Sequence, residues 1–434
     1  MASVISKWIS SFAERCDIVR DPSHDSASDM CHDADVDRQD PVVIVGGSLA
    51  GLRTAQALRR EGHEGPLTIV GDEAHWPPFD RPPLSKQLLV GSLEPDRVRL
   101  RVPDDLDVEV RTGCRADHLD VAGRAVVLED GSRLEYGAAV IATGAAPRRL
   151  AGTDGLGGVH VLRTIDDSTA LRTDLEGARR VVVVGAGFIG CEVASSCRTL
   201  GLDVTLVDLL PLPLAPFGPV AGEIVAGMHR SNGVDLRLGV GVAGLDGDAG
   251  GRVRAVRLAD GTTAAADVVV VGIGVVPNTA WLDGSGLVLD DGLCCDDACL
   301  AHGGDGTVAA VGDVARWEHP RYGSLRIEHW TNAGEQAAHV AKVLLHGREV
   351  AGPYAPVPYF WSDQFGRKLQ FVGICGDGDE FEVMEGSVDE GRWVAAYGRN
   401  GVTVAALCVS WPARLGPWQA LVAREGVPFP PPLP

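Results

Sequence analysis

Two glycine-rich segments, about 140 residues apart, carry the clearest chemistry in this sequence. In the second segment, the apolar run Val181 to Val184 leads into Gly185, Gly187 and Gly190. A helical pattern and another apolar run follow, and that run ends at Asp208. Such a strand–turn–helix unit binds a dinucleotide, because the free N–H groups at the helix N-terminus hold the pyrophosphate and the acid binds ribose hydroxyls.

The first segment is a variant of the same unit. Val42 to Val45 precedes Gly46 and Gly51, and Asp72 follows the next apolar run. Ser48 stands at the middle glycine position, where the backbone must approach the phosphates. Serine is small and its hydroxyl can contact phosphate, so we interpret this segment as a working variant. Two such units predict two separately bound nucleotides.

Asp208 also indicates which nicotinamide nucleotide is used. A carboxylate at this position accepts a hydrogen bond from a ribose 2′-hydroxyl and repels a 2′-phosphate. The residues that follow, Leu209 to Leu212, supply no arginine for that phosphate. The sequence therefore favours NADH over NADPH.

Length and charge limit the remaining possibilities. A chain of 434 residues is too long for one core and predicts two or three domains. Its net charge of −20 argues against nucleic acid or an anionic membrane as partner. No apolar run approaches the roughly 20 residues that span a bilayer, and no signal peptide is evident. A cytoplasmic location is the expectation.

Metal chemistry finds no support in the sequence. The ten cysteines form no CxxC pair, and the twelve histidines show no HExxH spacing. Cys294, Cys295 and Cys299 cluster without a histidine or second cysteine pair to complete a zinc site. We therefore expect no metal.

Five further motifs lie between and beyond the two glycine-rich units, and together they resemble a known family. The family is that of the FAD-dependent pyridine nucleotide-disulphide oxidoreductases, and specifically the ferredoxin reductases of oxygenase systems. The resemblance covers residues 41 to about 425. The motifs are FDRPPLSK (79–86), ATG (142–144), TVAAVGDVARW (307–317), RIEHWTNAGEQA (326–337) and FWSDQFG (360–366).

The resemblance implies that the first unit holds FAD and the second NADH. Lys86 would lie beside flavin N5, paired with Glu192 near the nicotinamide, and Trp330 would pack beside the isoalloxazine ring. These three are the expected catalytic residues. The expected FAD contacts are Gly46, Ser48, Ala50, Gly51, Asp72, Arg81, Lys86, Ala116, Thr143, Gly144, Arg148, Gly312, Asp313 and Trp330. The expected NAD contacts are Gly185, Gly187, Ile189, Gly190, Glu192, Asp208 and Gly274.

The resemblance gives these FAD contacts different roles. Ala50 would lie near the pyrophosphate, and Asp72 would bind the adenosine ribose. Arg81 and Arg148 would neutralise phosphates, and Asp313 would accept a hydrogen bond from the ribityl chain.

Disulphide reductases of this superfamily carry CxxxxC in the helix after the first glycine segment. No cysteine occurs here between Gly46 and Cys114. The expected route is therefore from NADH through the flavin, one electron at a time, to a small acidic ferredoxin or rubredoxin that serves a P450 or Rieske oxygenase. Arg97, Arg99 and Arg101, and the pair Arg367–Lys368, are the candidate docking residues. Two alternatives remain: an NADH oxidase or quinone reductase on the same scaffold, and a non-catalytic NADH-responsive flavoprotein.

The predicted fold class is α/β, with two Rossmann-like nucleotide-binding domains of the glutathione reductase type and a C-terminal α+β domain. Monomer and dimer both stay open. The expected divisions are a disordered extension (1–40), a discontinuous FAD domain (41–152 and 278–354), an NADH domain (153–277), a C-terminal domain (355–426) and a proline-rich tail (427–434).

Overall fold

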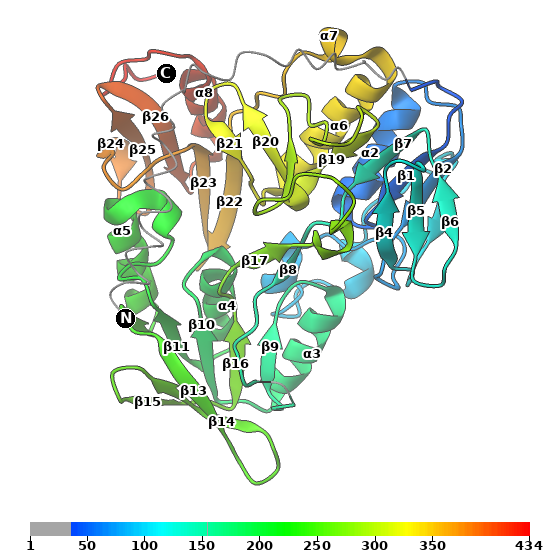
Figure 1. Cartoon of the computed structure of the whole chain (residues 1–434). Helices are drawn as coiled ribbons and strands as arrows, with labels where there is room; N and C mark the ends of the chain where they lie inside the picture. The colour runs from blue at the N-terminus through cyan, green and yellow to red at the C-terminus, as the bar shows by residue number, and fades with distance from the viewer. Residues whose placement is uncertain (1–35, 154) are drawn as a thin grey trace, which may run out of the picture. The chain divides into compact units, whose positions relative to one another are not determined.

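A computed structural model describes residues 36–153 and 155–434 of the chain (Figure 1). Three five-stranded sheets organise these described residues. Two of them are parallel and carry the glycine-rich units, and the third is antiparallel and follows them in the chain.

The first sheet has the strand order β19-β7-β1-β2-β3 and is parallel throughout. Strand β1 is buried along its whole length, as expected for a valine-rich strand covered on both faces. Helices α2 and α6 pack against each other beside this sheet (Figure 1). The elements are β1 (Val42–Val45), α2 (Leu49–Arg60), β2 (Leu67–Val70), β3 (Glu109–Arg111), β7 (Ala138–Ile141), β19 (Val308–Ala310) and α6 (Trp330–His346).

Two smaller antiparallel or mixed sheets and several helical turns extend this region. They are β4 (Ala116–Asp120), β5 (Ala125–Leu128), β6 (Arg133–Glu135), β18 (Leu293–Cys295), β20 (Ala315–His319), β21 (Gly323–Leu325), η2 (Pro82–Ser85), η3 (Pro95–Val98), η5 (Ala280–Leu282), η6 (Gly312–Val314) and α7 (Arg348–Ala351).

Four strands of the second parallel sheet are ordered like four strands of the first. Its order is β12-β11-β10-β16-β9, and the central strand β10 leads into the second glycine-rich loop, just as the central strand β1 leads into the first. The elements of this region are β9 (Val159–Val161), α3 (Ile165–Glu176), β10 (Arg180–Val184), α4 (Phe188–Thr199), β11 (Asp203–Asp208), η4 (Ala215–Phe217), α5 (Gly218–Ser231), β12 (Val234–Leu238), β13 (Val242–Gly247), β14 (Val253–Leu258), β15 (Thr263–Ala265) and β16 (Val268–Val271). Of these, β13, β14 and β15 form a separate three-stranded antiparallel sheet.

The chain passes between the two parallel sheets along a two-stranded ribbon of β8 (Ala145–Pro147) and β17 (Val275–Pro277). Both strands of this ribbon lie next to candidate nucleotide residues, since β8 follows the ATG turn and β17 follows Gly274.

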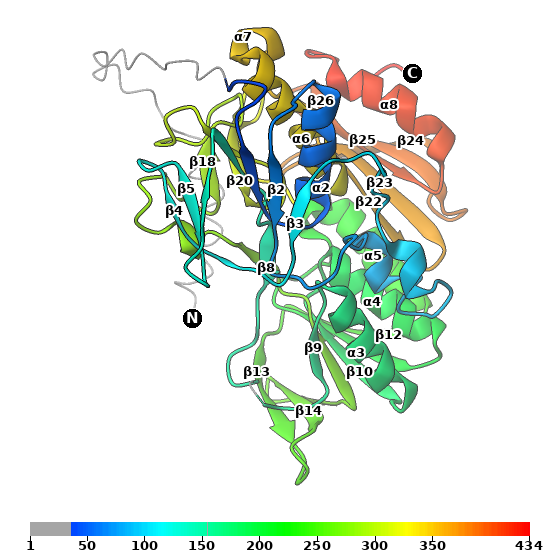
Figure 2. The ribbon, with the colours of Figure 1, turned by 90° about the vertical axis from the view of Figure 1, so that its right-hand side faces the viewer.

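The third sheet, β22-β23-β26-β25-β24, is antiparallel. Helix α8 covers one face through Trp418, and the other face contributes Phe371 and Tyr397 to the core around the second sheet (Figure 2). Tyr397 donates a hydrogen bond to the Phe217 carbonyl at 2.8 Å. The elements are β22 (Tyr359–Gln364), β23 (Arg367–Gly373), β24 (Glu380–Ser387), β25 (Arg392–Arg399), β26 (Val402–Val409) and α8 (Pro412–Ala423).

The expectation that residues 1–40 are disordered is wrong for residues 36–40. Val36 is buried in the core of the first sheet. The Arg38 carbonyl accepts hydrogen bonds from the backbone N–H groups of Glu64 and Gly65, at 2.9 and 2.8 Å. The acidic, aromatic-free sequence cannot order itself, but these contacts with distant parts of the fold hold residues 36–40 in place. Residues 1–35 lie outside the described part of the chain.

Two other local expectations change. The proline-rich end is extended but paired: Thr403 donates its backbone N–H to Val427, and Phe429 donates to Gly401. Residues 97–101 are not a strand, because Pro95–Val98 forms a 3₁₀ turn. The arginines there are still exposed, since Val98 and Leu100 are the residues that turn inward.

Among the described residues, no helix is both long and apolar enough to cross a membrane. The same residues contain no group of three or more His, Cys, Asp or Glu side chains arranged to hold a metal ion.

The packing of residues 36–40 generates a prediction. A chain that begins at Pro41 should be less stable than one that begins at Val36, because the backbone N–H groups of Glu64 and Gly65 lose their acceptor and Val36 no longer covers the core. A loss of about 1–3 kcal/mol is expected, measured as a lower urea midpoint. Equal midpoints for the two chains would show that these contacts contribute nothing.

Candidate functional site

The second glycine-rich loop leaves an open space at the N-terminus of α4. A Cβ at Gly185 would collide with the Gly272 carbonyl, and one at Gly190 would collide with the Gly185 carbonyl. A Cβ at Gly187, by contrast, would meet no atom of the described residues within 4 Å. Gly187 is the N-cap of α4, and none of the side chains that the structure describes caps that helix, so its N–H groups remain available to a phosphate.

Asp208 lies at the end of β11 and faces this loop. Its carboxylate accepts hydrogen bonds from the backbone N–H of Ala186 at 2.5 Å and of Leu210 at 2.7 Å. Apolar side chains surround the loop in unusually exposed positions: Ile189, Leu209, Leu210 and Ile273 are 43%, 61%, 46% and 36% exposed. A bound nucleotide would cover such side chains, which fits NAD at this loop.

The first glycine-rich loop is built in the same way. A Cβ at Gly46 would collide with the Ala142 carbonyl, and one at Gly51 with the Gly46 carbonyl. Ser48 is the N-cap of α2 but makes no capping hydrogen bond, because its hydroxyl accepts one from Arg81 Nη2 at 3.1 Å. The N–H groups of α2 therefore stay free, and the serine variant keeps the anion-binding end of the helix.

Arg81 is held in this loop by partners on two sides. Its guanidinium bonds Glu73 at 2.6 Å and the Arg163 carbonyl at 2.6 Å. Burial and the neighbouring Arg163 lower the pKa of Arg81, whereas Glu73 raises it. Arg81 thus lies at the loop that the sequence assigned to FAD phosphates.

The ATG turn is tied to the start of η5. Thr143 donates its hydroxyl to the Asn278 carbonyl at 2.9 Å, and the Asn278 side chain donates back to the Thr143 carbonyl at 2.9 Å. Gly144 has a φ of +65°, which favours glycine. Arg148 is exposed, and its backbone N–H donates to Gly274 across the β8–β17 ribbon.

Small residues bring α2, η6 and α6 together. Gly312 has a φ of +75°, and a Cβ there would lie 3.1 Å from Ala50 and 3.7 Å from Ala333. Its N–H donates to the Gln336 side chain at 2.8 Å. The next residue, Asp313, pairs with Arg163 at 2.8 Å.

Arg163 is a functional candidate that the sequence did not reveal. It precedes α3 and meets Asp313, 150 residues later in the chain, and a Cβ at Gly144 would lie 3.1 Å from its guanidinium. Neither a motif nor a spacing marks this arginine, since only the fold joins these segments. Asp72 is exposed and Ala116 is buried at the start of β4. Their expected contacts with FAD stay predictions.

The expected pair of Lys86 and Glu192 is present. Lys86 Nζ lies 3.0 Å from Glu192 Oε2, and their side chains are 11% and 4% exposed. The Glu192 carboxylate also accepts hydrogen bonds from Ser85 at 2.5 Å and Ser362 at 2.8 Å. A buried charge is tolerated only when it is paired and hydrogen-bonded, and this one is.

Local packing explains how Lys86 reaches this position. Leu84, Leu88 and Leu89 are buried and anchor the turn η2 and the residues after it. Helix α4 fixes the end of that turn, because Ser196 donates its hydroxyl to the Ser85 carbonyl at 2.7 Å. The turn η2, which follows the first nucleotide unit, is thereby attached to α4, the helix of the second unit.

Trp330 begins α6 and donates its indole N–H to Asp80 at 2.6 Å. Burial raises the pKa of Asp80, and the bond from Trp330 opposes that rise. Trp330 also meets Trp361 edge-on, with ring centroids 6.0 Å apart. Burial lowers the pKa of the preceding residue, His329, to about 4, so its imidazole is neutral at pH 7. The contacts with Asp80 and Trp361 hold the Trp330 side chain in one orientation at the start of α6.

The described residues fit FAD and a nicotinamide nucleotide. Two helix N-termini are uncapped by side chains, two glycine loops exclude a Cβ where backbones meet, and a lysine–glutamate pair lies between the two units. Cys191 and Cys197 in α4 are buried free thiols whose pKa values burial raises, that of Cys197 to about 12. They do not supply a reactive thiolate.

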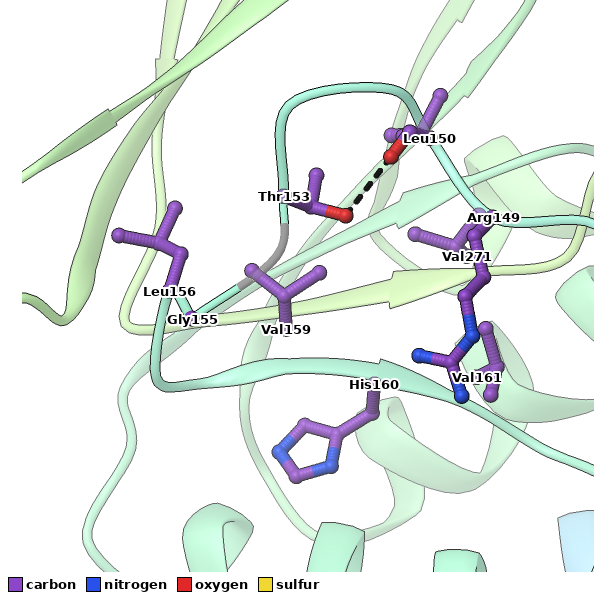
Figure 3. A pocket seen from close by; sticks show the side chains of 9 residues that line it. All are labelled: Arg149, Leu150, Thr153, Gly155, Leu156, Val159, His160, Val161 and Val271. Carbon is purple, nitrogen blue, oxygen red and sulfur yellow. Dashed lines mark hydrogen bonds between the residues drawn. The ribbon is translucent and has the colours of Figure 1, made fainter.

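A separate hollow lies beside the edge strand β9 (Figure 3). Arg149, His160 and Val271 are among its lining residues. None of the expected nucleotide-binding residues lines it, and His160 is engaged by Asp174 at 2.8 Å. The candidate site is therefore built at the glycine loops and not at this hollow.

Fold and site together define a two-dinucleotide flavoprotein oxidoreductase. Comparison with family models gives the family: residues 40–337 match pyridine nucleotide-disulphide oxidoreductase, and residues 359–432 match the reductase C-terminal family. The chain belongs to the pyridine nucleotide-disulphide oxidoreductase family. The flavoprotein fold class and the family resemblance expected from the sequence are both confirmed.

Curated relatives include ferredoxin reductases. The chain is 37% identical to the ferredoxin–NAD(P)⁺ reductase of Sphingomonas sp., over 85% of this chain and 89% of that protein. It is 34% identical to putidaredoxin reductase of Pseudomonas putida, over 86% and 89%. A crystal structure of a covalent putidaredoxin reductase–putidaredoxin complex matches with a TM-score of 0.83 and 33% identity, covering 90% of this chain and 94% of that one.

The burial of the ion pair generates a prediction about stability. Glu192→Ala leaves a buried ammonium unpaired and should lower the free energy of unfolding by about 3–5 kcal/mol. Lys86→Met should cost less, because Glu192 keeps its hydroxyl donors and the methionine fills the same space. Urea unfolding of both variants at pH 7 measures the difference. A larger loss of unfolding free energy for Lys86→Met than for Glu192→Ala would mean that the Glu192 carboxylate is not the centre of this network.

Proposed function

We propose that this protein is an NADH-dependent FAD reductase that passes electrons singly to a [2Fe–2S] ferredoxin or rubredoxin serving a P450 or Rieske oxygenase. The observation that carries the proposal is the buried Lys86–Glu192 pair, which joins the turn after the first nucleotide unit to the helix of the second. The relatives named as ferredoxin reductases support the choice of acceptor.

In this proposal the protein's residues bind and orient while the cofactors do the chemistry. Bound FAD would accept hydride from NADH and release electrons one at a time. The N-termini of α2 and α4 would hold the two pyrophosphates. Lys86 would place its ammonium beside the flavin, and Glu192 would keep that ammonium paired in a site from which water is excluded.

The roles of the remaining candidates belong to the same proposal. Arg81 would neutralise FAD phosphates from its half-buried position, and Arg163 is a second cation at that side of the site. Asp313, which pairs with Arg163, would face the ribityl chain. Trp330 would pack against the isoalloxazine ring.

An acidic acceptor needs local positive charge on a protein whose net charge is −20. Arg97 and Arg101 are exposed, and Lys368 lies over the Trp361 ring at 5.5 Å. Trp361 contacts Trp330, the residue proposed to pack against the flavin. Lys368 is therefore on the same side of the third sheet as Trp330. We take this side as the docking face.

The division into FAD, NADH and C-terminal domains is part of the proposal, with the β8–β17 ribbon as the crossing between the first two. A cytoplasmic location is also proposed. The cysteines in the described part of the chain are free thiols, which fits a reducing compartment.

One experiment tests the proposed function. Stopped-flow reduction of the FAD-loaded protein by NADH should be fast, and reoxidation should be far faster with a ferredoxin or rubredoxin than with oxygen or a quinone. Lys86→Met should slow the reduction step at least tenfold, because the positive charge beside the flavin is lost. Preferred reoxidation by oxygen or quinone would identify an oxidase or quinone reductase instead. Failure of NADH to reduce the flavin would contradict any reductase.

Asp208 provides a second test, of nucleotide preference. Kcat/KM should be higher with NADH than with NADPH. Asp208→Asn should lower the ratio of kcat/KM with NADH to kcat/KM with NADPH by about tenfold, because a hydrogen bond involving a charged group is worth about 1.5–3 kcal/mol. Asparagine keeps an acceptor for the Ala186 N–H, whereas Asp208→Ala removes it. Comparison of the two variants therefore distinguishes the effect of the carboxylate charge from the effect of the hydrogen bond that supports the loop. Equal use of both nucleotides by the unmodified protein would refute the assignment.

A further inference from the structure

A chain of buried polar side chains runs through the end of β22 to the candidate site. Its members are His229 on α5, Gln364 and Ser362 on β22, and Glu192 on α4. All four are at most 3% exposed. Buried polar groups are costly unless each finds a partner, so a continuous chain of them needs a reason.

Each link in the chain is a hydrogen bond of ordinary length. His229 Nε2 lies 2.9 Å from Gln364 Oε1, and Gln364 Nε2 lies 3.0 Å from Ser362 Oγ. Ser362 Oγ lies 2.8 Å from Glu192 Oε1. The other carboxylate oxygen, Oε2, meets Lys86 Nζ.

The direction of the chain follows from its ends. A carboxylate only accepts, so Ser362 must donate to Glu192, and its oxygen is then free to accept from the Gln364 amide. The Gln364 carbonyl oxygen consequently faces His229, which donates through Nε2. Burial lowers the pKa of His229, so the ring is neutral and carries one N–H. Every donor therefore points towards Glu192.

Glu192 depends on Ser362 for one of its two oxygens. Among the described residues, Oε1 accepts one further hydrogen bond besides that of the Ser362 hydroxyl, a 3.4 Å contact from the Asp363 backbone N–H. Oε2 is shared by Ser85 and Lys86. Without the Ser362 hydroxyl, the carboxylate is held firmly at one oxygen only and can rotate away from the ammonium.

We propose that Ser362, held by Gln364 and His229, is a positioning residue that keeps the Glu192 carboxylate turned towards Lys86 at the hydride-transfer site. This inference rests on the proposed function. It gives the third sheet a role in the reaction with NADH: β22 orients a group on the NADH-binding helix as well as covering the site. His229 extends the same control to α5.

Ser362→Ala tests the inference, with Ser195→Ala as its matched control. Ser195 is on the same helix as Glu192 and accepts a hydrogen bond from the Phe365 N–H at 2.7 Å. Within the described part of the chain, the hydrogen bonds of the Glu192 carboxylate go to other residues. Both changes remove one mostly buried hydroxyl that links α4 to the β22 region. A general weakening of this interface would therefore affect both variants alike.

Three measurements distinguish positioning from support. With Ser362→Ala, flavin reduction at saturating NADH should slow about tenfold, while the NADH concentration at half-saturation changes less than twofold. The long-wavelength absorbance that forms when NAD⁺ binds the reduced protein should weaken, since it reports the alignment of the two rings. The FAD content and thermal midpoint of Ser362→Ala should match those of Ser195→Ala. The flavin of Ser195→Ala should be reduced by NADH at the rate of the unmodified protein.

A second variant keeps the inference testable if Ser362→Ala folds poorly. Gln364→Met removes the middle link at similar volume and should slow reduction by a smaller factor, because Ser362 can still donate. Unchanged reduction rates and absorbance in both variants would overturn the inference. If Lys86→Met is also unchanged, the proposed function fails; if only Lys86→Met is slow, the function stands and Ser362 has no positioning role.

Discussion

The burial of one ion pair is the constraint on which the rest of the structure depends. Lys86 and Glu192 lie 3.0 Å apart with little exposure to water, and charges in such a place must be fully satisfied by the protein. The carboxylate of Glu192, on α4, is satisfied by two other regions of the chain, through Ser85 next to Lys86 and through Ser362 and the Asp363 backbone on β22. The pair therefore forms only when the two nucleotide units and the third sheet are assembled.

Close backbone approach is the second requirement, and glycine meets it. In each parallel sheet, a glycine in the loop and another in the helix remove the Cβ atoms that would separate helix from strand. Gly187 has a different role, because its missing side chain leaves open space at the helix end. Ser48 fills the corresponding space in the first unit and turns its hydroxyl to Arg81, so the two loops are alike in geometry and different in chemistry.

The third sheet holds its neighbours through an aromatic core. Phe360 and Phe371 of this sheet stack on Phe217 of the second unit, with centroids 5.6 and 5.2 Å apart, and Phe188 at the start of α4 meets Phe360 at 4.6 Å. Large rings bury much apolar area with few rotatable bonds. This core sets β22 beside α4, which is the placement that the buried polar chain through Ser362 requires.

The sequence by itself determined the local units and their chemistry. Valine runs, glycine spacing and strand-end acids depend on contacts within about 30 residues, so two nucleotide units and the variant at Ser48 could be inferred directly. The pairing of Lys86 with Glu192 followed from resemblance alone. Only the tertiary structure placed Arg163 against Asp313 and Ser362 against Glu192, 150 and 170 residues apart. No periodicity encodes such contacts, because they arise where separately folded sheets meet.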